Sequence, residues 1–220
     1  MPTTDSTLAH EIQTPERLRE ILGAPMQRTL EKERTRLHAM DRAWLAASPL
    51  CLIATSDSQG RCDVSPKGDP KGFIKVLDDC TLAIPERPGN RRADGFHNIL
   101  QNPHVGLISI VPGRRDTLRI NGRARLVSDA PWFDSLTVEG HRPALALVVE
   151  IEEIFFHCAK AFMRAAAWNP DSWAPDELPS HAKLVKSVQE TDMTLDELEA
   201  YYGPSYRKLL YKPFDADSDS

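Results

Sequence analysis

The chain has 220 residues, of which 41% are hydrophobic and 27% charged, and its formal net charge at pH 7 is −5. This composition is typical of a globular protein, and the length suffices for one domain with extensions and a sizeable core. The acidic balance argues against nucleic-acid binding, which needs a broad basic surface, and no apolar run approaches the length of a membrane span.

The beginning of the chain and its cysteines predict a cytoplasmic protein. The segment "MPTTDSTLAHEIQTPERL" lacks a basic stretch followed by an apolar one, so we see no secretory signal. The cysteines are scattered without a CxxC pair, which favours free thiols in a reducing compartment over a disulfide framework. They are Cys51, Cys62, Cys80 and Cys158.

The N-terminal part predicts two helices. Thr14 is a good N-cap, Pro15 suits the first helical position, and Gly23 is a stop signal, so a helix is expected between them. A longer helix is predicted over residues 26–47, because apolar residues recur there at helical spacing. This apolar stripe comprises Leu30, Leu37, Met40, Trp44 and Leu45.

From residue 50 onward, short apolar runs separated by turns predict a series of antiparallel strands. Tight turns join several neighbouring runs into hairpins, and short helices are expected near residues 92–103 and 130–137. The last part of the chain has helical patterns at residues 159–168, 181–189 and 194–203. The expected strand segments are 50–55, 61–65, 73–77, 80–85, 104–127 as a pair around "PGRRD", and 143–158 as one long or two shorter strands.

This order predicts a mainly β (α+β) protein, in which six or seven strands form a closed antiparallel β-barrel with helical additions. No alternation of strands and helices of the βαβ kind is visible, which disfavours a Rossmann sheet. The final "DADSDS" is expected to be a solvated tail.

No common catalytic or metal-binding motif is present. GxGxxG, GxxxxGK[ST], HExxH and GxSxG are all absent, and the histidines are dispersed. His157 and Cys158 are neighbours in a strand-like segment, where adjacent side chains point to opposite faces and cannot readily share one ion. We therefore predict no metal site and name no catalytic residue; demanding chemistry would belong to a bound cofactor.

The stretch "AIPERPGNRRADGF" concentrates positive charge in an acidic chain. Arg87, Arg91 and Arg92 surround a Pro-Gly-Asn turn, and a helix is expected to start directly after it. Arginines, turn amides and a helix N-terminus together suit a phosphate group. The alternative is a solvated loop with ion pairs to Glu86 and Asp94, and these residues alone support both interpretations equally.

Several motifs in order resemble the pyridoxamine 5′-phosphate oxidase-like family of FMN-binding proteins. They are "DVSPKGD", "IPERPGNRRADGFHNIL" and "VPGRRDTLRINGRA", and the resemblance covers roughly residues 44–127. It is closest to a flavin-nucleotide-binding subgroup. The resemblance implies an antiparallel split β-barrel of about six strands, a homodimer, and one FMN per subunit in a cleft at the dimer interface.

The resemblance also implies a set of FMN contacts. Carried over by position, the second strand would line the flavin ring and ribityl chain, and the stretch that follows the fourth strand would hold the phosphate. His157 and Lys160 would close over the flavin from near the C-terminus. The residues implied to bind FMN are Val64, Ser65, Pro66, Lys67, Ile84, Pro85, Arg87, Asn90, Arg91, Arg92, His157 and Lys160.

We accordingly expect three parts: an N-terminal helical extension over 1–47, an FMN-binding split barrel over 48–158, and a C-terminal helical segment over 159–220 that packs on the barrel or the dimer partner. The expected function is an FMN-dependent oxidoreductase acting with NAD(P)H or a small substrate. A non-enzymatic flavin carrier is the alternative. A split barrel adapted to haem, based on His157, or to a deazaflavin is a further one. No nucleic-acid or membrane partner is expected.

Overall fold

The computed structural model describes residues 10–212, and the contacts divide the chain into two compact units, Met1–Glu33 and Arg34–Ser220. The described part of the first unit contains α1 (Pro15–Leu22) and α2 (Gln27–Leu30). The Thr14 hydroxyl accepts a hydrogen bond from the Arg17 amide at 3.2 Å, and Gly23 ends α1 with a positive φ of 74°. Both predicted ends of this helix are confirmed.

The single long helix predicted over residues 26–47 is wrong. The chain leaves the helix after α2 and returns to it only at α3 (Ala39–Ala47). Between them, the Arg34 amide donates to the Ile154 carbonyl at 3.1 Å, and the Ile154 amide donates back to Arg34 at 2.7 Å. This pairing with the barrel overrides the local helical propensity.

The apolar stripe divides accordingly. Leu37, Trp44 and Leu45 belong to the main hydrophobic core, whereas Leu30 and Met40 are 51% and 62% exposed. The Trp44 indole donates to the Ser109 carbonyl at 3.3 Å and meets Phe156 edge-on, which fixes α3 on the barrel.

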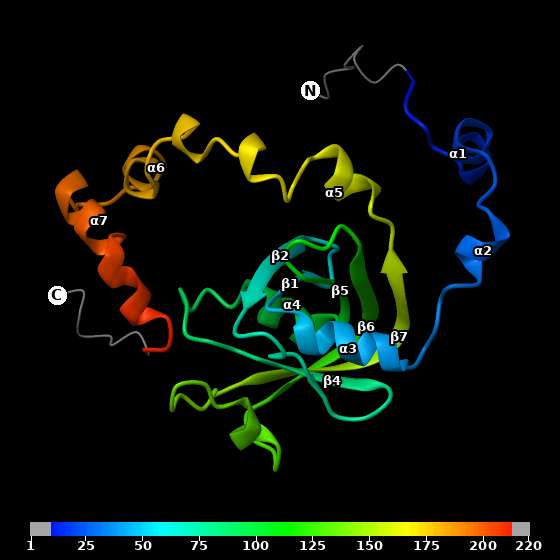
Figure 1. The fold of residues 1–220 in the computed structure, drawn as a ribbon, viewed down its shortest axis with the longest axis horizontal. Helices are drawn as coiled ribbons and strands as arrows, with labels where there is room; N and C mark the ends of the chain where they lie inside the picture. The colour runs from blue at the N-terminus through cyan, green and yellow to red at the C-terminus, as the bar shows by residue number, and fades with distance from the viewer. Residues whose placement is uncertain (1–9, 213–220) are drawn as a thin grey trace. The chain divides into compact units, whose positions relative to one another are not determined.

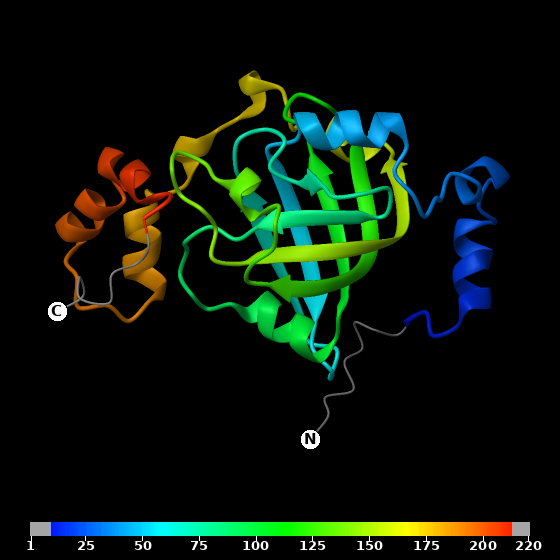
Figure 2. The ribbon, with the colours of Figure 1, turned by 90° about the horizontal axis from the view of Figure 1, so that it is seen from below.

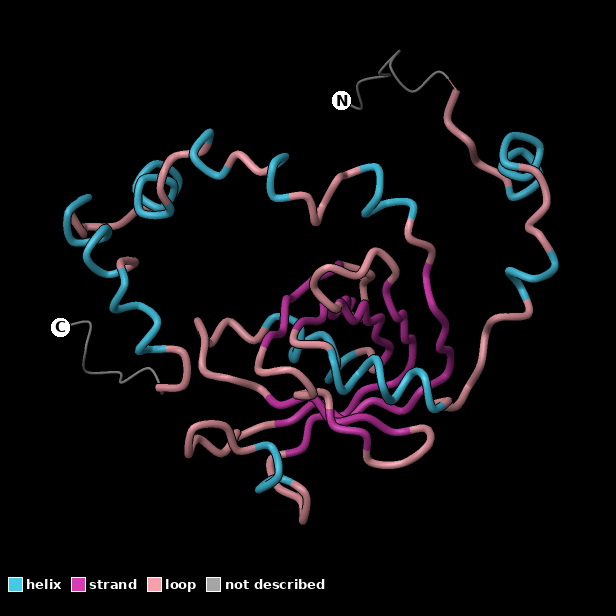
Figure 3. Tube along the Cα trace, in the orientation of Figure 1, coloured by secondary structure: helices cyan, strands magenta, loops and turns pink. Residues whose placement is uncertain are grey.

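The second unit is built on one antiparallel sheet of seven strands in the order β2-β1-β5-β6-β7-β4-β3. The views in Figures 1 and 3 show these strands curling around one centre. The end strands β2 and β3 do not pair with each other in the described residues, so the sheet is curled without being closed. The strands are β1 (Leu50–Ser56), β2 (Cys62–Gly68), β3 (Lys75–Val76), β4 (Thr81–Pro85), β5 (His104–Ile110), β6 (Thr117–Val127) and β7 (Ala146–His157).

This sheet confirms the predicted antiparallel barrel class with helical additions, but the predicted closure is not found, because the described end strands β2 and β3 do not pair. The last predicted strand segment forms the single long strand β7, which pairs with β6 on one side and β4 on the other. The run 73–77 contributes only the two residues of β3, while the segment expected as a short helix near 130–137 is a 3-10 turn, Phe133–Leu136.

Two helices cover the ends of the barrel. Figure 2 shows α3 at one end and α4 (Asp94–Gln101) at the other. Both bury apolar side chains in the same core as the inward-facing strand residues: α3 contributes Trp44 and Leu45, and α4 contributes Ile99. The first turn of α4 packs tightly on β1 and β2. A Cβ added to Gly95 would lie only 3.1 Å from the Asp63 carboxylate, so there is little room for a larger residue.

The strand β6 carries an irregularity that only glycine fits. The register between β6 and β7 shifts between Asn121 and Gly122, and a Cβ on Gly122 would lie 2.0 Å from the Glu150 carbonyl oxygen of β7. That distance is far below any real contact, so the two backbones approach here more closely than any side chain allows.

The C-terminal segment is made of short helices joined by loops (Figure 3). It contains α5 (Lys160–Arg164), α6 (His181–Val188) and α7 (Leu195–Tyr201), followed by a 3-10 helix, Pro204–Leu209. The helices α6 and α7 share a small core of their own, formed by Ala182, Val185 and Leu198. In the part of the chain that is described, no helix is long and apolar enough to cross a membrane.

Candidate functional site

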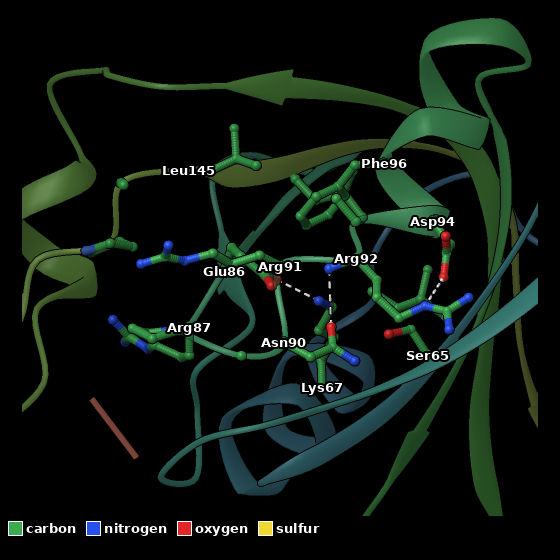
Figure 4. Close-up of a pocket in the computed structure, with 18 of the residues that line it drawn as sticks. Ser65, Lys67, Glu86, Arg87, Asn90, Arg91, Arg92, Asp94, Phe96 and Leu145 are labelled. Carbon is green, nitrogen blue, oxygen red and sulfur yellow. Dashed lines mark hydrogen bonds and ion pairs between the residues drawn. The ribbon is translucent and has the colours of Figure 1, made fainter. Parts of the chain in front are cut away.

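A cavity of about 610 Å³ opens beside β1, β2 and the start of α4 (Figure 4). This volume is within the range of about 300–1,000 Å³ that is usual for small-molecule and cofactor sites. Its walls come from the two strands, from the stretch 86–96 after β4, from the loop 141–145 before β7, from Leu147 and from Tyr211 near the C-terminus.

The alternation of strand side chains explains which part of β2 faces this cavity. Asp63, Ser65 and Lys67 lie on one face of the strand, opposite Thr55, Ile53 and Cys51 of β1 respectively. Because successive side chains point to opposite faces, every second residue of β2 is directed to the cavity. The first three residues line it, together with Ile53 and Thr55.

The stretch after β4 forms a turn with two left-handed residues, Arg91 at φ 58° and Ala93 at φ 57°. The Asn90 side-chain oxygen accepts a hydrogen bond from the Arg92 amide at 3.1 Å, which fixes the turn between them. The turn leads directly into α4, whose first-turn amides and positive dipole end lie at the cavity wall beside Gly95. Arginines and a helix N-terminus therefore meet at one end of the cavity.

Two cationic side chains of the cavity form ion pairs with carboxylates of the cavity. The Lys67 ammonium pairs with Glu86 and lies 4.9 Å from the centre of the Phe96 ring. Arg92 donates from Nε to Asp94 at 2.8 Å, the pairing that the alternative interpretation of this loop expected. Five cationic side chains and three carboxylates line the cavity, so its formal charge is positive in an acidic chain. The cations are Lys67, Arg87, Arg91, Arg92 and Arg142.

Arg87 lines the cavity but is engaged in a structural cluster. Its Nε and Nη2 bind the Asp69 carboxylate at 2.7 and 2.6 Å, and the guanidinium also donates to the carbonyls of Leu136 at 2.7 Å and His141 at 3.2 Å. A guanidinium has five N–H donors, so one is left without a partner among the described residues. The resemblance implied Arg87 as a phosphate ligand. In the structure, most of its donors instead hold the Asp69 carboxylate and two backbone carbonyls in place.

Half of the residues implied to bind FMN line the cavity: Ser65, Lys67, Arg87, Asn90, Arg91 and Arg92. The others in the barrel do not. Val64 is 61% exposed and Pro66 is exposed beside it, because both lie on the outer face of β2. Ile84 is buried in the core and Pro85 is buried at the end of β4, and neither lines the cavity.

The implied C-terminal contacts lie elsewhere. His157 and Lys160 are exposed at the end of β7 and the start of α5, and neither lines the cavity. The His157 ring stacks on Phe155 with 6.1 Å between centroids. That these residues close over a bound flavin stays a prediction.

Several cavity residues escaped the sequence analysis. Phe96 and Leu145, both labelled in Figure 4, add apolar surface to the cavity wall. His141, Arg142 and Tyr211 come from the loop before β7 and from the C-terminal segment. The alternating pattern of β2 could have separated Ser65 and Lys67 from their neighbours, but no local signal points to Tyr211.

A thiol next to this wall is buried. Cys51 is fully buried on β1, directly across from Lys67, and burial raises the pKa of its thiol to about 12 although the lysine opposes the shift. A buried thiol with such a pKa carries almost no thiolate at neutral pH, so it is a packing group rather than a nucleophile. Within residues 10–212, no group of three or more His, Cys, Asp and Glu side chains is placed to hold a metal ion.

Residues 37–158, more than half of the chain, match the model of a family described as "Pyridoxamine 5′-phosphate oxidase". No curated protein matches. Similar solved structures include HupZ from Group A Streptococcus, which is 17% identical with a TM-score of 0.44 and covers 55% of this chain and 93% of HupZ.

Two further solved structures match with similar identity, TM-score and coverage. A candidate pyridoxamine 5′-phosphate oxidase from Lactobacillus delbrueckii is 23% identical, with a TM-score of 0.44 and coverage of 56% of this chain and 95% of its own. The haem-storage protein HutZ from Vibrio cholerae is 18% identical, with a TM-score of 0.37 and coverage of 55% and 94%. Similarity at this level says nothing about ligands of this chain, and the family match is the informative finding.

Proposed function

The chain belongs to the pyridoxamine 5′-phosphate oxidase family, and from that premise we propose that it is an FMN-binding oxidoreductase that moves electrons between FMN and NAD(P)H or a small substrate. One observation carries this proposal: a single cavity combines a cationic helix N-terminus at one end with an apolar wall along its side. That combination suits a ligand with a phosphate at one end and a flat aromatic ring at the other.

The cationic end fits a phosphate. Arg91 and Arg92 flank the turn that leads into α4, and the amides of Asp94 and Gly95 at its first turn have no hydrogen-bond partner among the described residues. A phosphate placed here would receive charge-assisted hydrogen bonds and the favourable end of the helix dipole.

The remaining walls fit the rest of FMN. Phe96, Leu145 and Leu147 offer apolar surface for a ring, and Ser65 and Thr55 offer hydroxyls for the polar chain. When bound, FMN supplies a ring system that accepts and donates electrons as a hydride or singly. The residues of this chain would bind it, orient it and exclude water, and Lys67, held by Glu86, would offer a hydrogen-bond donor at the polar wall.

We expect FMN to bind at least about tenfold more tightly than riboflavin, which lacks the phosphate. A charge-assisted hydrogen bond contributes about 1.5–3 kcal/mol, and each ~1.4 kcal/mol is a factor of ten in affinity. Titrating each flavin into the flavin-free protein and following fluorescence quenching measures both constants. Equal affinities would remove the phosphate from the recognition of the ligand.

The absorbance spectrum of the purified protein separates the candidate cofactors, because flavin gives bands in the blue and near-ultraviolet and haem gives a Soret band. The haem alternative was based on His157, which does not line the cavity. Bleaching of the flavin bands by NAD(P)H without oxygen would support a reductase, and failure with every donor would favour the flavin carrier.

We further propose that the protein acts as a homodimer, with the outer face of β2, β1 and β5 as the contact. Apolar side chains form a cross-strand row there: Pro66 lies opposite Leu52, and Leu52 lies opposite Ile108. Ile108 is 38% exposed and the neighbouring Val64 61% exposed, so this row presents apolar surface that a second copy could cover.

Analytical ultracentrifugation should give about twice the 24.6 kDa of one chain. Val64→Arg should shift the protein toward the monomer, because it places a charge in the proposed contact. The matched control is Val188→Arg on α6, where the valine is 78% exposed and lies outside this face. A stable FMN-loaded monomer at micromolar concentration would contradict the dimer.

A further inference from the structure

Three segments far apart in the chain meet at one buried carboxylate beside the cavity. Asp69, in the loop after β2, has only 1% of its side chain exposed. One of its oxygens binds the Arg87 guanidinium, and the other accepts a hydrogen bond from the Tyr211 hydroxyl at 2.6 Å. Arg87 in turn binds the carbonyls of Leu136 and His141, so the loop before β7 joins the same cluster.

The Tyr211 ring is held by contacts of its own. It stacks on His141 with 5.8 Å between centroids and an angle of 15°, and the Arg87 guanidinium lies 5.6 Å from its centre. Burial, reinforced by Asp69, raises the pKa of Tyr211 to about 12; Glu139 acts in the same direction and Arg87 against it. The phenol therefore keeps its proton at neutral pH and remains a donor to the carboxylate.

Tyr211 also forms part of the cavity wall, so this attachment closes the cavity with a piece of the C-terminal segment. The segment is tied to the barrel near its other end as well, where the Trp168 indole donates to the Arg114 carbonyl at 2.6 Å. Between these two attachments, α6 and α7 pack on each other around their own small core. Releasing Tyr211 would thus free a stretch of chain without disturbing the main core.

We propose that residues 204–212 are a strap over the cavity, with Tyr211 as its fastening and the Asp69–Arg87 pair as the receptor, and that a ligand enters and leaves when Tyr211 is released. The proposal deepens the proposed function, because the cavity is the proposed FMN site. It assigns Arg87 a positioning role: Arg87 holds Asp69 and the loop before β7 in the geometry that receives the tyrosine.

A strap and a ligand contact have different kinetic signatures. If the closed state blocks passage, opening it more often raises the association and dissociation rates together and leaves the affinity nearly unchanged. If Tyr211 instead contacts the ligand, its loss raises the dissociation rate alone, as is usual for a contact residue. The ratio of the two effects therefore distinguishes the roles.

The experiment compares wild type with Tyr211→Phe, which removes only the hydroxyl and keeps the ring. The matched control is Tyr206→Phe in the 3-10 helix Pro204–Leu209, which directly precedes Tyr211; this tyrosine is 42% exposed and its ring contacts other tyrosines. The first measurement uses the protein without FMN and follows tryptic cleavage after Arg207 and Lys208, which are exposed within the strap. The second measures kon and koff of FMN by stopped-flow fluorescence.

In Tyr211→Phe we expect cleavage to accelerate roughly tenfold, since a hydrogen bond to a charged group is lost. Both kon and koff should rise by a similar factor while Kd changes by less than about twofold. Cleavage equal to that of Tyr206→Phe, or a rise in koff alone, would overturn the strap. If wild-type protein binds no FMN, the proposed function fails, and the cleavage measurement still decides on the strap.

Discussion

Replacing Arg91 by alanine should weaken FMN binding by roughly tenfold or more. Arg91 lies in the turn that leads into α4, where its side chain and the first-turn amides can converge on one phosphate. Loss of a charge-assisted contact costs about 1.5–3 kcal/mol, and ~1.4 kcal/mol is a tenfold change in Kd. Fluorescence-quenching titrations of FMN into wild type and variant measure the effect.

Two further variants make the Arg91 result specific. Arg91→Lys should recover only part of the affinity, because an ammonium cannot reproduce the planar fork of the guanidinium. Arg115→Ala is the matched control, since Arg115 is equally cationic but lies outside the cavity, between β5 and β6. Added salt should weaken wild type more than Arg91→Ala. If Arg115→Ala loses as much affinity as Arg91→Ala, the phosphate site has been assigned to the wrong arginine.

Gly122→Ala should destabilise the folded protein by about 3 kcal/mol or more, the upper range for a group forced into a packed interior. Its new Cβ would lie 2.0 Å from the Glu150 carbonyl oxygen and 3.3 Å from the Ile151 Cα. Both atoms belong to the backbone of β7 and cannot turn aside. The variant can form only if β6 and β7 separate locally at the centre of the sheet, with loss of ladder hydrogen bonds.

Thermal unfolding followed by circular dichroism tests this expectation, since 1 kcal/mol shifts Tm by about 2–4 °C in a chain of this size. Gly68→Ala is the control: a Cβ there would lie 3.5 Å from the Pro49 carbonyl oxygen, an ordinary contact, and Gly68 ends an edge strand. We expect that variant to lie within about 1 kcal/mol of wild type. A Gly122→Ala protein with the same Tm as wild type would show that β6 and β7 can move apart at little cost.

The fold was predictable where its causes are local. The cap at Thr14 and the stop at Gly23 fix α1 from within a few residues, and the turn between β1 and β2 fixes that hairpin in the same way. The failed helix over 26–47 shows the limit of such signals. Its interruption comes from hydrogen bonds between Arg34 and Ile154, which are far apart in the sequence and meet only in the folded sheet.

In the candidate site, too, local patterns predicted some features, and contacts between distant segments determined the others. Ser65 and Lys67 were named together with Val64 and Pro66 because all four share one motif, and only the direction in which the sheet curls decides which two face inward. The contacts of Arg87 with Leu136 and His141, and the hydrogen bond of Tyr211 with Asp69, join segments that the sequence keeps apart. Local patterns carry no trace of such pairings.

The burial of Cys51 affects how resistant the protein would be to oxidation by the products of its own reaction. Under the proposed function, electrons that reach dioxygen from a reduced cofactor produce peroxide beside this wall, where a reactive thiol would be oxidised first. Peroxide attacks the thiolate, and a thiol with a pKa of about 12 offers almost none. Cys51, which lies opposite Lys67 in the sheet, would therefore stay reduced during repeated turnover in air. Oxidative damage would begin at the exposed thiols of Cys62 and Cys158.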